Sequence, residues 1–180
     1  MADTLKVGIV TLSDRASRGE YTDRGGPKVE ELLRRFLESS WEAVKKILPD
    51  DEKLLEDTLR SLSDDEGCQL IITTGGTGPA PRDVTPDATL RVCQKILPGF
   101  GELMRAISYK KVPTAILSRQ TAGIYNNKTL IVNLPGKPAA IEDCLPAIFP
   151  AVVDCLDLLG VKGVEVNRAE VSVHRPHRED

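Results

Sequence analysis

A glycine-rich segment between an apolar run and a helix-start signal constrains the fold of this chain more than any other feature. Residues 75–78 (GGTG) follow residues 70–72 (LII), an apolar run that is typical of a buried strand. Thr85 as an N-cap and Pro86 at the first helical position then predict the start of a helix. Glycines let backbone N–H groups approach an anion closely, and a helix N-terminus adds partial positive charge. The segment therefore predicts a phosphate-binding turn between a strand and a helix.

Asp83 lies in the same loop and adds a negative charge beside the predicted phosphate site. Because phosphates would repel this carboxylate, the loop indicates a nucleotide-like anion bound together with a hard cation such as Mg²⁺. A tight turn without a ligand is the alternative, since short glycine patterns alone are weak signals. The loop is not a Walker A loop, because the required lysine and hydroxyl residue do not follow the glycines. Several prolines, Arg82 and Asp83 within one loop exceed what a turn requires and favour a binding site.

Length and composition fit one globular domain. The chain has 180 residues, of which 41% are hydrophobic, and this suffices for a sizeable core. We expect the domain to span residues 1–166, followed by a polar, flexible C-terminal tail over residues 167–180. The net charge of −3 gives no indication of nucleic acid or an anionic membrane as a partner. No apolar run approaches the roughly 20 residues needed to cross a bilayer. The N-terminal residues lack a secretory signal, so a cytoplasmic location is expected.

Cysteine and histidine content excludes several classes of site. The four cysteines form no CxxC pair, so neither a zinc site nor a disulfide framework is expected. Three of them, Cys93, Cys144 and Cys155, fall in predicted helices and are expected to be buried apolar groups. Both histidines, His174 and His177, lie in the C-terminal tail. Nucleophilic schemes that depend on histidine are therefore excluded.

Hydrophobic periodicity predicts strands that alternate with helices. The expected strands span residues 5–12, 41–48, 69–74, 114–118, 123–125 and 129–134. The expected helices span residues 27–37, 51–62, 86–96, 101–110 and 139–159, the last one interrupted at Pro146 and Pro150. The final two strands form a hairpin through residues 126–128. This order predicts an α/β fold, a three-layer α/β/α sandwich whose mostly parallel sheet has an antiparallel edge.

Polar and glycine residues gather just after the ends of the predicted strands. The segments concerned are residues 13–15, 50, 75–83, 118–119 and 133–138. In open α/β sheets the ligand binds outside the carboxyl ends of the strands. If the strands are parallel neighbours, these segments meet in one crevice, which is the predicted binding site.

For several residues in these segments, the sequence is compatible both with a role in ligand binding and with a purely structural role. Asp50 is either a carboxylate of the site or the N-cap of the helix over residues 51–62. Arg82 either contacts a phosphate or forms a surface salt bridge. Asp14 either touches the ligand or holds a neighbouring loop in place. The turn over residues 133–138 either binds a ligand or only leads into the next helix.

Residues 75–89 (GGTGPAPRDVTPDAT) resemble the signature of the molybdenum cofactor biosynthesis family, which includes the bacterial MogA and MoaB proteins and the G domain of gephyrin. Further matches follow in the same order over nearly the whole chain. They are SDRAS at 13–17, LPD at 48–50, PGFGE at 98–102, AILSR at 115–119 and NLPGKP at 133–138. Within the family, the prolines after the glycines are more similar to the MogA version than to the MoaB version.

The resemblance implies an enzyme that adenylylates molybdopterin with Mg²⁺ and ATP, giving molybdopterin-AMP and pyrophosphate. Asp50 and Asp83 match the two catalytic aspartates of the family, and they would also hold the Mg²⁺ ion. The substrate- and nucleotide-binding residues that it implies are Ser13, Asp14, Thr74, Gly75, Gly76, Thr77, Gly78, Arg82, Ser118, Asn133, Pro135 and Gly136. The resemblance also implies a homotrimer and contacts with other proteins of molybdenum cofactor biosynthesis.

A molybdopterin-binding or scaffold protein of the same fold, similar to MoaB and without transferase activity, is the main alternative. Asp50 and Asp83 are both present in the chain, which argues against it. A generic nucleotide-binding domain or a phosphatase ranks last, because no phosphatase nucleophile motif stands out in the sequence.

Overall fold

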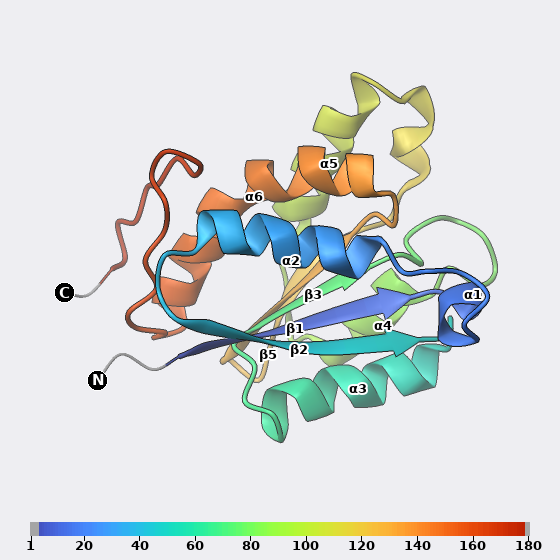
Figure 1. Ribbon diagram of the computed structural model, residues 1–180, viewed down its shortest axis with the longest axis horizontal. Helices are drawn as coiled ribbons and strands as arrows, with labels where there is room; N and C mark the ends of the chain where they lie inside the picture. Colours follow the sequence, from blue (N-terminus) through green and yellow to red (C-terminus); the bar gives the residue numbers. More distant parts are fainter. Residues whose placement is uncertain (1–3, 179–180) are drawn as a thin grey trace.

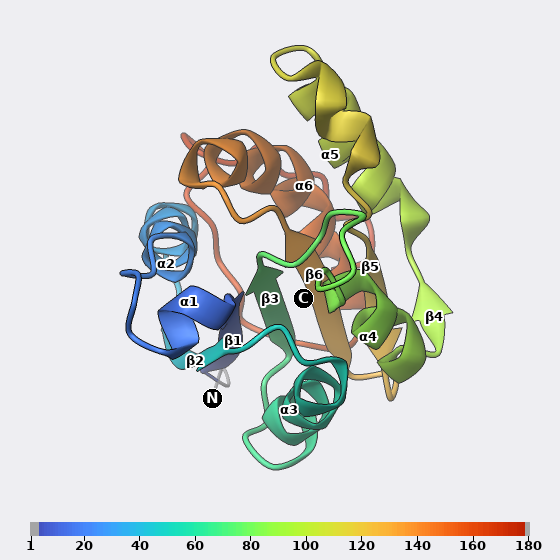
Figure 2. The same ribbon diagram turned by 90° about the vertical axis from the view of Figure 1, so that its right-hand side faces the viewer.

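The protein folds into three layers, with a six-stranded sheet between two layers of helices (Figure 1, Figure 2). The computed structural model describes residues 4–178. Residues 1–3 and 179–180 lie outside it, and with them part of the segment on which the prediction about a secretory signal rests. The strands are β1 (Leu5–Leu12), β2 (Trp41–Leu48), β3 (Leu70–Thr74), β4 (Lys95–Ile96), β5 (Ala122–Tyr125) and β6 (Thr129–Leu134). The helices are α1 (Asp14–Ser17), α2 (Gly25–Phe36), α3 (Glu52–Asp64), α4 (Thr85–Val92), α5 (Pro98–Tyr109), the 3-10 helix η1 (Pro113–Leu117) and α6 (Pro138–Leu158).

The sheet is parallel except at one edge. Its strand order is β2-β1-β3-β6-β5-β4. β1 pairs in parallel with β2 and β3, and β3 pairs in parallel with β6. β5 runs antiparallel to both β6 and β4. The predicted α/β/α sandwich with a mostly parallel sheet and an antiparallel edge is therefore confirmed.

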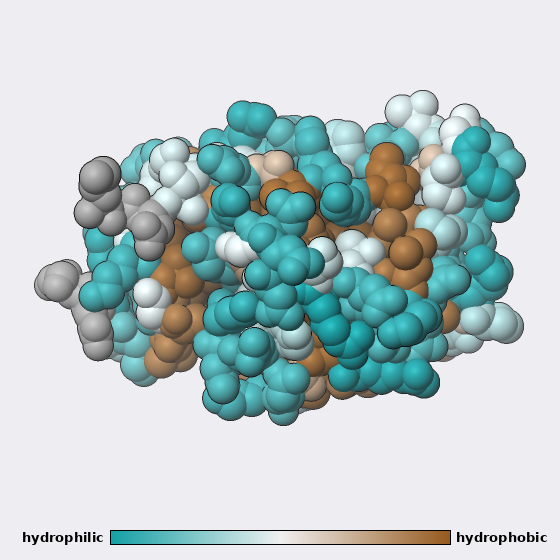
Figure 3. Space-filling view, turned by 90° about the horizontal axis from the view of Figure 1, so that it is seen from below, coloured by the Kyte–Doolittle hydropathy of each residue, from teal (hydrophilic) through white to brown (hydrophobic). Residues whose placement is uncertain are grey.

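Alternation along β1 divides its side chains between two hydrophobic cores. Val7 and Ile9 pack with residues of α2 and α6, whereas Val10 and Leu12 pack with residues of α3 and α4. The central strands β3 and β6 are buried along their whole length, as expected for strands covered on both faces. The outer surface on the α3 side is mostly hydrophilic (Figure 3), so α3 turns only one face to the core.

The hairpin between β5 and β6 forms as predicted. Asn126 and Asn127 have φ values of 52° and 54°. Two consecutive residues in the left-handed region match the twist of antiparallel strands, and asparagine tolerates this conformation better than most residues. The residue type thus explains why the chain reverses here.

The predicted strand over residues 114–118 is wrong, because this segment forms η1. Ile116 and Leu117 are 67% and 54% exposed, so the apolar run is not buried in a sheet. Pro113 begins the segment, and η1 packs beside α5 at one side of the molecule. Apolar composition predicted burial, but here it belongs to a surface segment.

The predicted break in the last helix is also wrong. α6 runs without interruption although Pro146 and Pro150 lie inside it. A proline inside a helix removes a backbone hydrogen bond and costs about 3 kcal/mol. Nine residues of α6 are buried, and their packing outweighs this cost. The prolines are four residues apart, so both lie on one half-buried flank of the helix.

Two other helix boundaries differ from the prediction because of tertiary contacts. α4 ends at Val92, and the residues after it pair with β5 as the short strand β4. α5 begins at Pro98, so the segment predicted to link two helices is the first turn of α5. Among the described helices, none is long and apolar enough to cross a membrane.

The C-terminal segment packs against the domain, which contradicts the expected flexible tail. The N–H of Asn167 donates to the Phe36 carbonyl at 2.8 Å, and Val171 is 2% exposed. Arg175 forms an ion pair with Asp157 at 2.5 Å, and both side chains are largely buried. Polar residues predicted flexibility, but here they supply the contacts that hold the segment.

Candidate active site

The carboxyl ends of β1, β3 and β6 meet at the end of the sheet that faces the viewer in Figure 2. A cavity of about 150 Å³ lies there. Its lining includes predicted binding residues from three segments, together with two residues absent from the prediction. They are Ser13, Thr74, Gly75, Gly136, Asp23 and Arg24. The structure thus brings together the segments that follow separate strands.

Backbone conformation and close packing both require glycine at the start of the 75–78 loop. Gly75 and Gly76 have φ values of 93° and 65°, a region that other residues rarely adopt. A Cβ atom on Gly75 would collide with the carbonyl oxygen of Leu12. A Cβ atom on Gly76 would lie 2.5 Å from Thr85 Oγ1 and 3.2 Å from Asp50 Oδ1. The loop backbone therefore passes directly beside the Asp50 carboxylate.

Thr85 holds the loop against α4, although it is not the N-cap. Val84 is the N-cap, and Thr85 is the first residue of the helix. The Thr85 hydroxyl donates to the Gly75 carbonyl at 2.9 Å, and the Thr85 N–H donates to the Gly76 carbonyl at 3.0 Å. The predicted helix start is therefore shifted by one residue, and Pro86 still lies in the first turn, where its missing N–H is tolerated.

Asp50 is not the N-cap of α3. Asp51 occupies that position, and its side chain accepts a hydrogen bond from Leu54 N–H at 2.8 Å. Asp50 turns instead toward the segment after β1, where its Oδ2 accepts from Asp14 N–H at 3.1 Å. Among the described residues, Asp50 Oδ1 accepts no hydrogen bond. The helix-cap interpretation of Asp50 is excluded, and one carboxylate oxygen is available to a ligand.

Arg82 bridges the glycine loop and the segment after β1. Its Nε and Nη2 donate to Asp14 Oδ2 and Oδ1 at 2.6 and 2.8 Å. Nη2 also donates to the Asp50 carbonyl at 3.2 Å. Arg82 is 67% exposed along its side chain, so its outer part remains open to solvent. The salt-bridge alternative for Arg82 and the loop-holding alternative for Asp14 are therefore both present in the structure.

The pKa values of the two neighbouring aspartates shift in opposite directions. Burial raises the pKa of Asp50, and the negative charges of Asp14 and Asp83 add to the increase. The hydrogen bond from Arg82 lowers the pKa of Asp14. Asp14 therefore keeps its charge readily, whereas the charge on Asp50 is costly unless a cation lies near it.

Asp83 lies at the C-terminal end of the loop over residues 75–83. Its Oδ2 accepts a hydrogen bond from Ala80 N–H at 3.1 Å. A Cβ atom on Gly78 would lie 2.6 Å from the same oxygen. Asp83 Oδ1 accepts no hydrogen bond from the residues that the structure describes. Gly76 thus carries the loop past Asp50 and Gly78 carries it past Asp83, so the two carboxylates flank the loop.

Ser118 reaches the site although it follows η1 and not a strand. Its hydroxyl donates to Thr77 Oγ1 at 3.4 Å. The next residue, Arg119, donates from its backbone N–H to the Thr77 carbonyl at 2.7 Å and from Nε to the Gly78 carbonyl at 2.9 Å. Arg119 is absent from the predicted site residues. Its signals in the sequence are its place in the polar segment over residues 118–119 and in the AILSR motif, but neither gives it a role of its own.

The turn after β6 forms a wall of the cavity. The Thr74 hydroxyl donates to the Pro135 carbonyl at 2.9 Å, and Gly75 N–H donates to the Leu134 carbonyl at 3.2 Å. A Cβ atom on Gly136 would lie 3.3 Å from Gly75 Cα. This turn therefore touches the glycine loop in addition to leading into α6.

Asn133 does not face the cavity. Its side chain is completely buried, and its Nδ2 donates to Thr73 Oγ1 at 3.1 Å and to Thr89 Oγ1 at 2.8 Å. These bonds join β6 to β3 and α4. The structure gives Asn133 a supporting role inside the sheet instead of the ligand contact that the resemblance implies.

Asp23 is a further residue of the site that the prediction lacks. Its Oδ1 accepts from the N–H groups of Gly25 and Gly26 at 3.0 and 3.2 Å. Its Oδ2 accepts from the Thr11 hydroxyl at 2.8 Å. Asp23 thereby holds the start of α2 beside the cavity. An aspartate shortly before two glycines is a turn signal, and it could have indicated this role.

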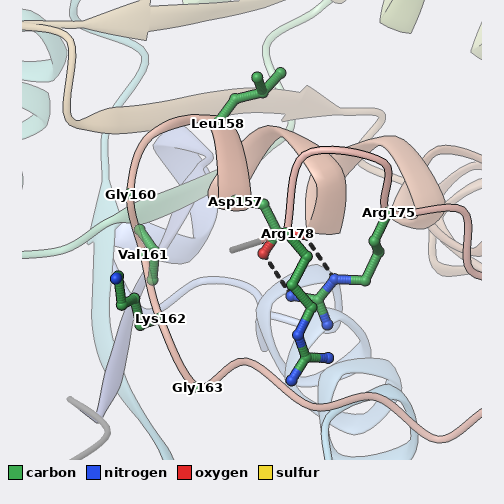
Figure 4. A pocket seen from close by; sticks show the side chains of 8 residues that line it. All are labelled: Asp157, Leu158, Gly160, Val161, Lys162, Gly163, Arg175 and Arg178. Atoms are coloured by element: carbon green, nitrogen blue, oxygen red, sulfur yellow. Dashed lines mark hydrogen bonds and ion pairs between the residues drawn. The ribbon is translucent and has the colours of Figure 1, made fainter. Parts of the chain in front are cut away.

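A second cavity, of about 310 Å³, is lined by residues from the end of α6 and from the C-terminal segment (Figure 4). In Figure 1 this segment lies at the left, at the opposite end of the molecule from α1. Arg175 points across the cavity to Asp157, with hydrogen bonds of 2.5 and 2.7 Å. Arg175 Nη1 also donates to the Val164 carbonyl at 2.6 Å. These bonds hold the C-terminal segment in place, and no predicted site residue lines this cavity.

Comparison with known proteins identifies the family of this chain. Residues 8–154 match the family described as "Probable molybdopterin binding domain". A molybdopterin adenylyltransferase of Helicobacter pylori is 51% identical over 173 residues, which cover 96% of this chain and 98% of that protein. The molybdopterin adenylyltransferase of Escherichia coli is 46% identical over 186 residues, with coverage of 97% and 95%.

Solved structures of similar proteins share the whole fold. The molybdopterin biosynthesis enzyme MoaB from Thermus thermophilus matches with a TM-score of 0.80 and 39% identity, covering 90% of this chain and 100% of that one. The Mog protein from Mycobacterium ulcerans matches with a TM-score of 0.79 and 35% identity, covering 87% and 99%. The family resemblance seen in the sequence motifs is confirmed, and the chain belongs to the molybdopterin-binding domain family that includes the MogA and MoaB proteins.

Proposed function

We propose that this chain is a molybdopterin adenylyltransferase of molybdenum cofactor biosynthesis, which transfers AMP from ATP to the terminal phosphate of molybdopterin and releases pyrophosphate. The observation that carries the proposal is the position of Asp50 and Asp83 on either side of the glycine loop. Relatives that match almost the whole chain bear this enzyme's name. Their names favour the transferase over a scaffold protein without activity.

The reaction requires no general base from the protein. A phosphate monoester has a second pKa of about 6, so the molybdopterin phosphate is largely ionised at pH 7. One of its oxygens forms a bond to the α-phosphorus, and the bond from that phosphorus to the bridging oxygen breaks as pyrophosphate leaves. Catalysis then depends on alignment and on neutralisation of charge. A site built from carboxylates, glycines and arginine suits this chemistry.

Asp50 and Asp83 are suited to a hard divalent cation. Each has one carboxylate oxygen that accepts no hydrogen bond from the described residues. Mg²⁺ prefers carboxylate and phosphate oxygens as ligands. Held by these two residues, Mg²⁺ would neutralise charge on the nucleotide phosphates. The burial and like charges that raise the pKa of Asp50 also make a cation favourable at this position.

The remaining predicted residues form the substrate contacts in this proposal. Backbone N–H groups of the loop over residues 76–78 would bind a phosphate, and the exposed guanidinium of Arg82 would add a charge-assisted contact. Ser13 and Gly136 line the cavity beside them. Ser118 and Thr77 place hydroxyl groups next to the loop.

We also propose that the chain forms a homotrimer and acts in the cytoplasm, where ATP is available. Exposed apolar side chains on and beside α5 and η1 support an interface at that side of the molecule. They are Leu103, Tyr109, Val112, Ile116 and Leu117. Sedimentation equilibrium of the purified protein would measure the subunit number directly, and a monomer at all concentrations would contradict the trimer.

Turnover of ATP labelled at the α-phosphate, with purified molybdopterin as acceptor, tests the proposed activity. The protein should form labelled molybdopterin-AMP and one pyrophosphate for each label transferred. Omission of Mg²⁺ should stop the transfer. Tight binding of molybdopterin without any transfer of label would support the scaffold alternative instead.

A further inference from the structure

Arg119 bonds to backbone carbonyls at both ends of the segment from Thr77 to Asp83, which includes the glycines and the carboxylate used in the proposed function. Its backbone N–H donates to the Thr77 carbonyl at 2.7 Å, and its Nε donates to the Gly78 carbonyl at 2.9 Å. Its Nη2 donates to the Asp83 carbonyl at 2.6 Å. Arg119 therefore fixes residues 77–78 and residue 83 relative to each other.

Asp87 holds the guanidinium of Arg119 in place. Nη1 and Nη2 donate to Asp87 Oδ1 and Oδ2 at 3.0 and 2.9 Å, a two-pronged geometry that only arginine provides. The hydrogen bond from Arg119 lowers the pKa of Asp87, so the pair stays charged. Asp87 lies in the first turn of α4. Arg119 thus ties the loop to the start of this helix.

The direction of these bonds determines where other backbone groups point. In a planar trans peptide the C=O and N–H groups point in opposite directions. The carbonyls of Thr77 and Asp83 point at Arg119, so the N–H groups of Gly78 and Val84 point away from it. Neither N–H donates a hydrogen bond to any described residue. Loop N–H groups of this kind are the donors that bind phosphate in proteins.

We infer that Arg119 is a positioning residue for adenylyl transfer, which holds the loop so that the Gly78 and Val84 N–H groups and the Asp83 carboxylate face the nucleotide. This inference rests on the proposed function. Arg119 acts through the loop, because four of its five guanidinium N–H donors bond to loop carbonyls and to Asp87. The expected effect of its loss is therefore on ATP and Mg²⁺, because Asp83, the proposed Mg²⁺ ligand, lies at the end of the segment that Arg119 holds.

Arg119→Lys is the test variant, because lysine keeps the charge but cannot bond to two carbonyls and Asp87 together. We expect kcat/KM for ATP to fall by about 10- to 100-fold, as for other supporting residues around a charged site. Half-maximal rate should require more Mg²⁺ than in the wild type. Amide hydrogen exchange should rise over residues 77–84 and stay unchanged in β3.

Arg105→Lys is the matched control. Arg105 also donates to backbone carbonyls next to Arg119, those of Ser118 at 3.3 Å and Gln120 at 3.0 Å. Its side chain makes no hydrogen bond to the glycine loop within the described part of the chain. Its ATP kinetics and its exchange over residues 77–84 should match the wild type. Asp87→Asn frees one side of the guanidinium and should give a smaller loss in the same direction as Arg119→Lys.

Kinetics and hydrogen exchange separate this inference from the proposed function. A wild-type protein without adenylyl transfer would overturn the proposed function, and exchange over residues 77–84 would still show whether Arg119 orders the loop. Wild-type exchange and wild-type ATP kinetics in Arg119→Lys would overturn the inference. Equal losses in Arg119→Lys and Arg105→Lys, in step with lower melting temperatures, would overturn it as well, since they would reveal a general effect on the fold.

Discussion

Asp14 and Asp50 each accept a hydrogen bond from the other's backbone, at 3.1 Å from Asp14 N–H to Asp50 Oδ2 and at 3.0 Å from Asp50 N–H to Asp14 Oδ1. The pair joins the ends of the neighbouring strands β1 and β2. Because both donors are backbone groups, the position of the Asp50 carboxylate is fixed by the path of the chain. Its other oxygen, Oδ1, is left next to Gly76.

Asp50→Asn should remove activity and keep the fold. The amide oxygen of asparagine can still accept the hydrogen bond from Asp14 N–H, and the buried charge disappears. We expect a melting temperature at pH 7 equal to or above that of the wild type, because burial disfavours the charged form of Asp50. Label transfer from ATP should fall by about 10²- to 10³-fold, the size typical of a lost electrostatic group.

Asp51→Ala is the natural control for this variant. Asp51 caps α3 through Leu54 N–H, and loss of an N-cap costs about 1 kcal/mol of stability. Turnover per folded molecule should stay normal. The helix cap and the carboxylate of the site are thus neighbouring residues. Loss of activity in Asp51→Ala together with loss of stability alone in Asp50→Asn would refute the assignment of Asp50.

The acid limit of the reaction should lie above the ordinary range of aspartate, which is about 3.9. Burial raises the pKa of Asp50 in the folded protein. Its charge therefore destabilises the fold above that pKa, and the penalty disappears as the pH falls through it. Activity changes the other way, because only the ionised carboxylate can hold a cation.

A pH profile of kcat/KM for ATP checks this expectation, with unfolding by urea measured over the same range. The rate should fall on acidification while the contribution of Asp50 to stability rises. Asp14 does not contribute in this window, since the bond from Arg82 lowers its pKa and its stabilising effect is lost only at still lower pH. The molybdopterin phosphate, with a second pKa of about 6, gives an acid limb of its own in every variant, so the Asp50→Asn protein is the reference. Profiles of the same shape in the wild type and in Asp50→Asn would contradict the role of Asp50.

The fold could be predicted because its determinants are local. β1 and β2 have the predicted bounds, since they contain apolar, aromatic and β-branched residues, which are enriched in strands. η1 could not be predicted, because the exposure of Ile116 and Leu117 depends on what packs beside them. The continuity of α6 through two prolines likewise depends on the core that this helix covers.

The location of the site followed from the strand ends, but individual roles did not. Asp50 and Asp51 are adjacent and chemically identical, and Asp14, far away in the sequence, decides which one turns to the glycine loop. The structural role of Asn133 arises from contacts with Thr73 and Thr89, which are distant in the chain. Tertiary contacts of this kind leave no local pattern in a single sequence.

Asn133→Ala should act on stability more than on ligand binding. The variant leaves the hydroxyls of Thr73 and Thr89 without their donor inside the core. An unsatisfied buried group costs about 1–3 kcal/mol, and urea unfolding should show a loss of this size. The KM for molybdopterin in the folded fraction should change little. A large rise in that KM with unchanged stability would restore the ligand contact that the family resemblance implies.

Asp83→Asn should abolish label transfer most strongly at limiting Mg²⁺. The asparagine oxygen can keep the hydrogen bond from Ala80 N–H, so the loop should hold its shape, but the metal would lose an anionic ligand. Asp57→Asn on α3 removes an exposed ion pair with Lys53 and serves as a control of equal charge change. Turnover across a range of Mg²⁺ concentrations distinguishes the two. Near-normal turnover of Asp83→Asn at limiting Mg²⁺ would show that Asp83 is not a metal ligand.

Gly76 and Gly160 allow backbone strain to be separated from damage to the site. Their φ values are 65° and 79°, so alanine at either position should cost about 1–2 kcal/mol. A Cβ atom at Gly160 has nothing within 4 Å, whereas at Gly76 it would lie 2.5 Å from Thr85 Oγ1 and 3.2 Å from Asp50 Oδ1. Both variants should therefore lose stability from the backbone, Gly76→Ala the more because of its contact with Thr85, and only Gly76→Ala should bind ATP or molybdopterin more weakly. Calorimetric titration with each ligand, alongside thermal unfolding, measures both effects. Wild-type affinity for both ligands in folded Gly76→Ala would mean that the loop is only a turn, and the active site would have to lie elsewhere.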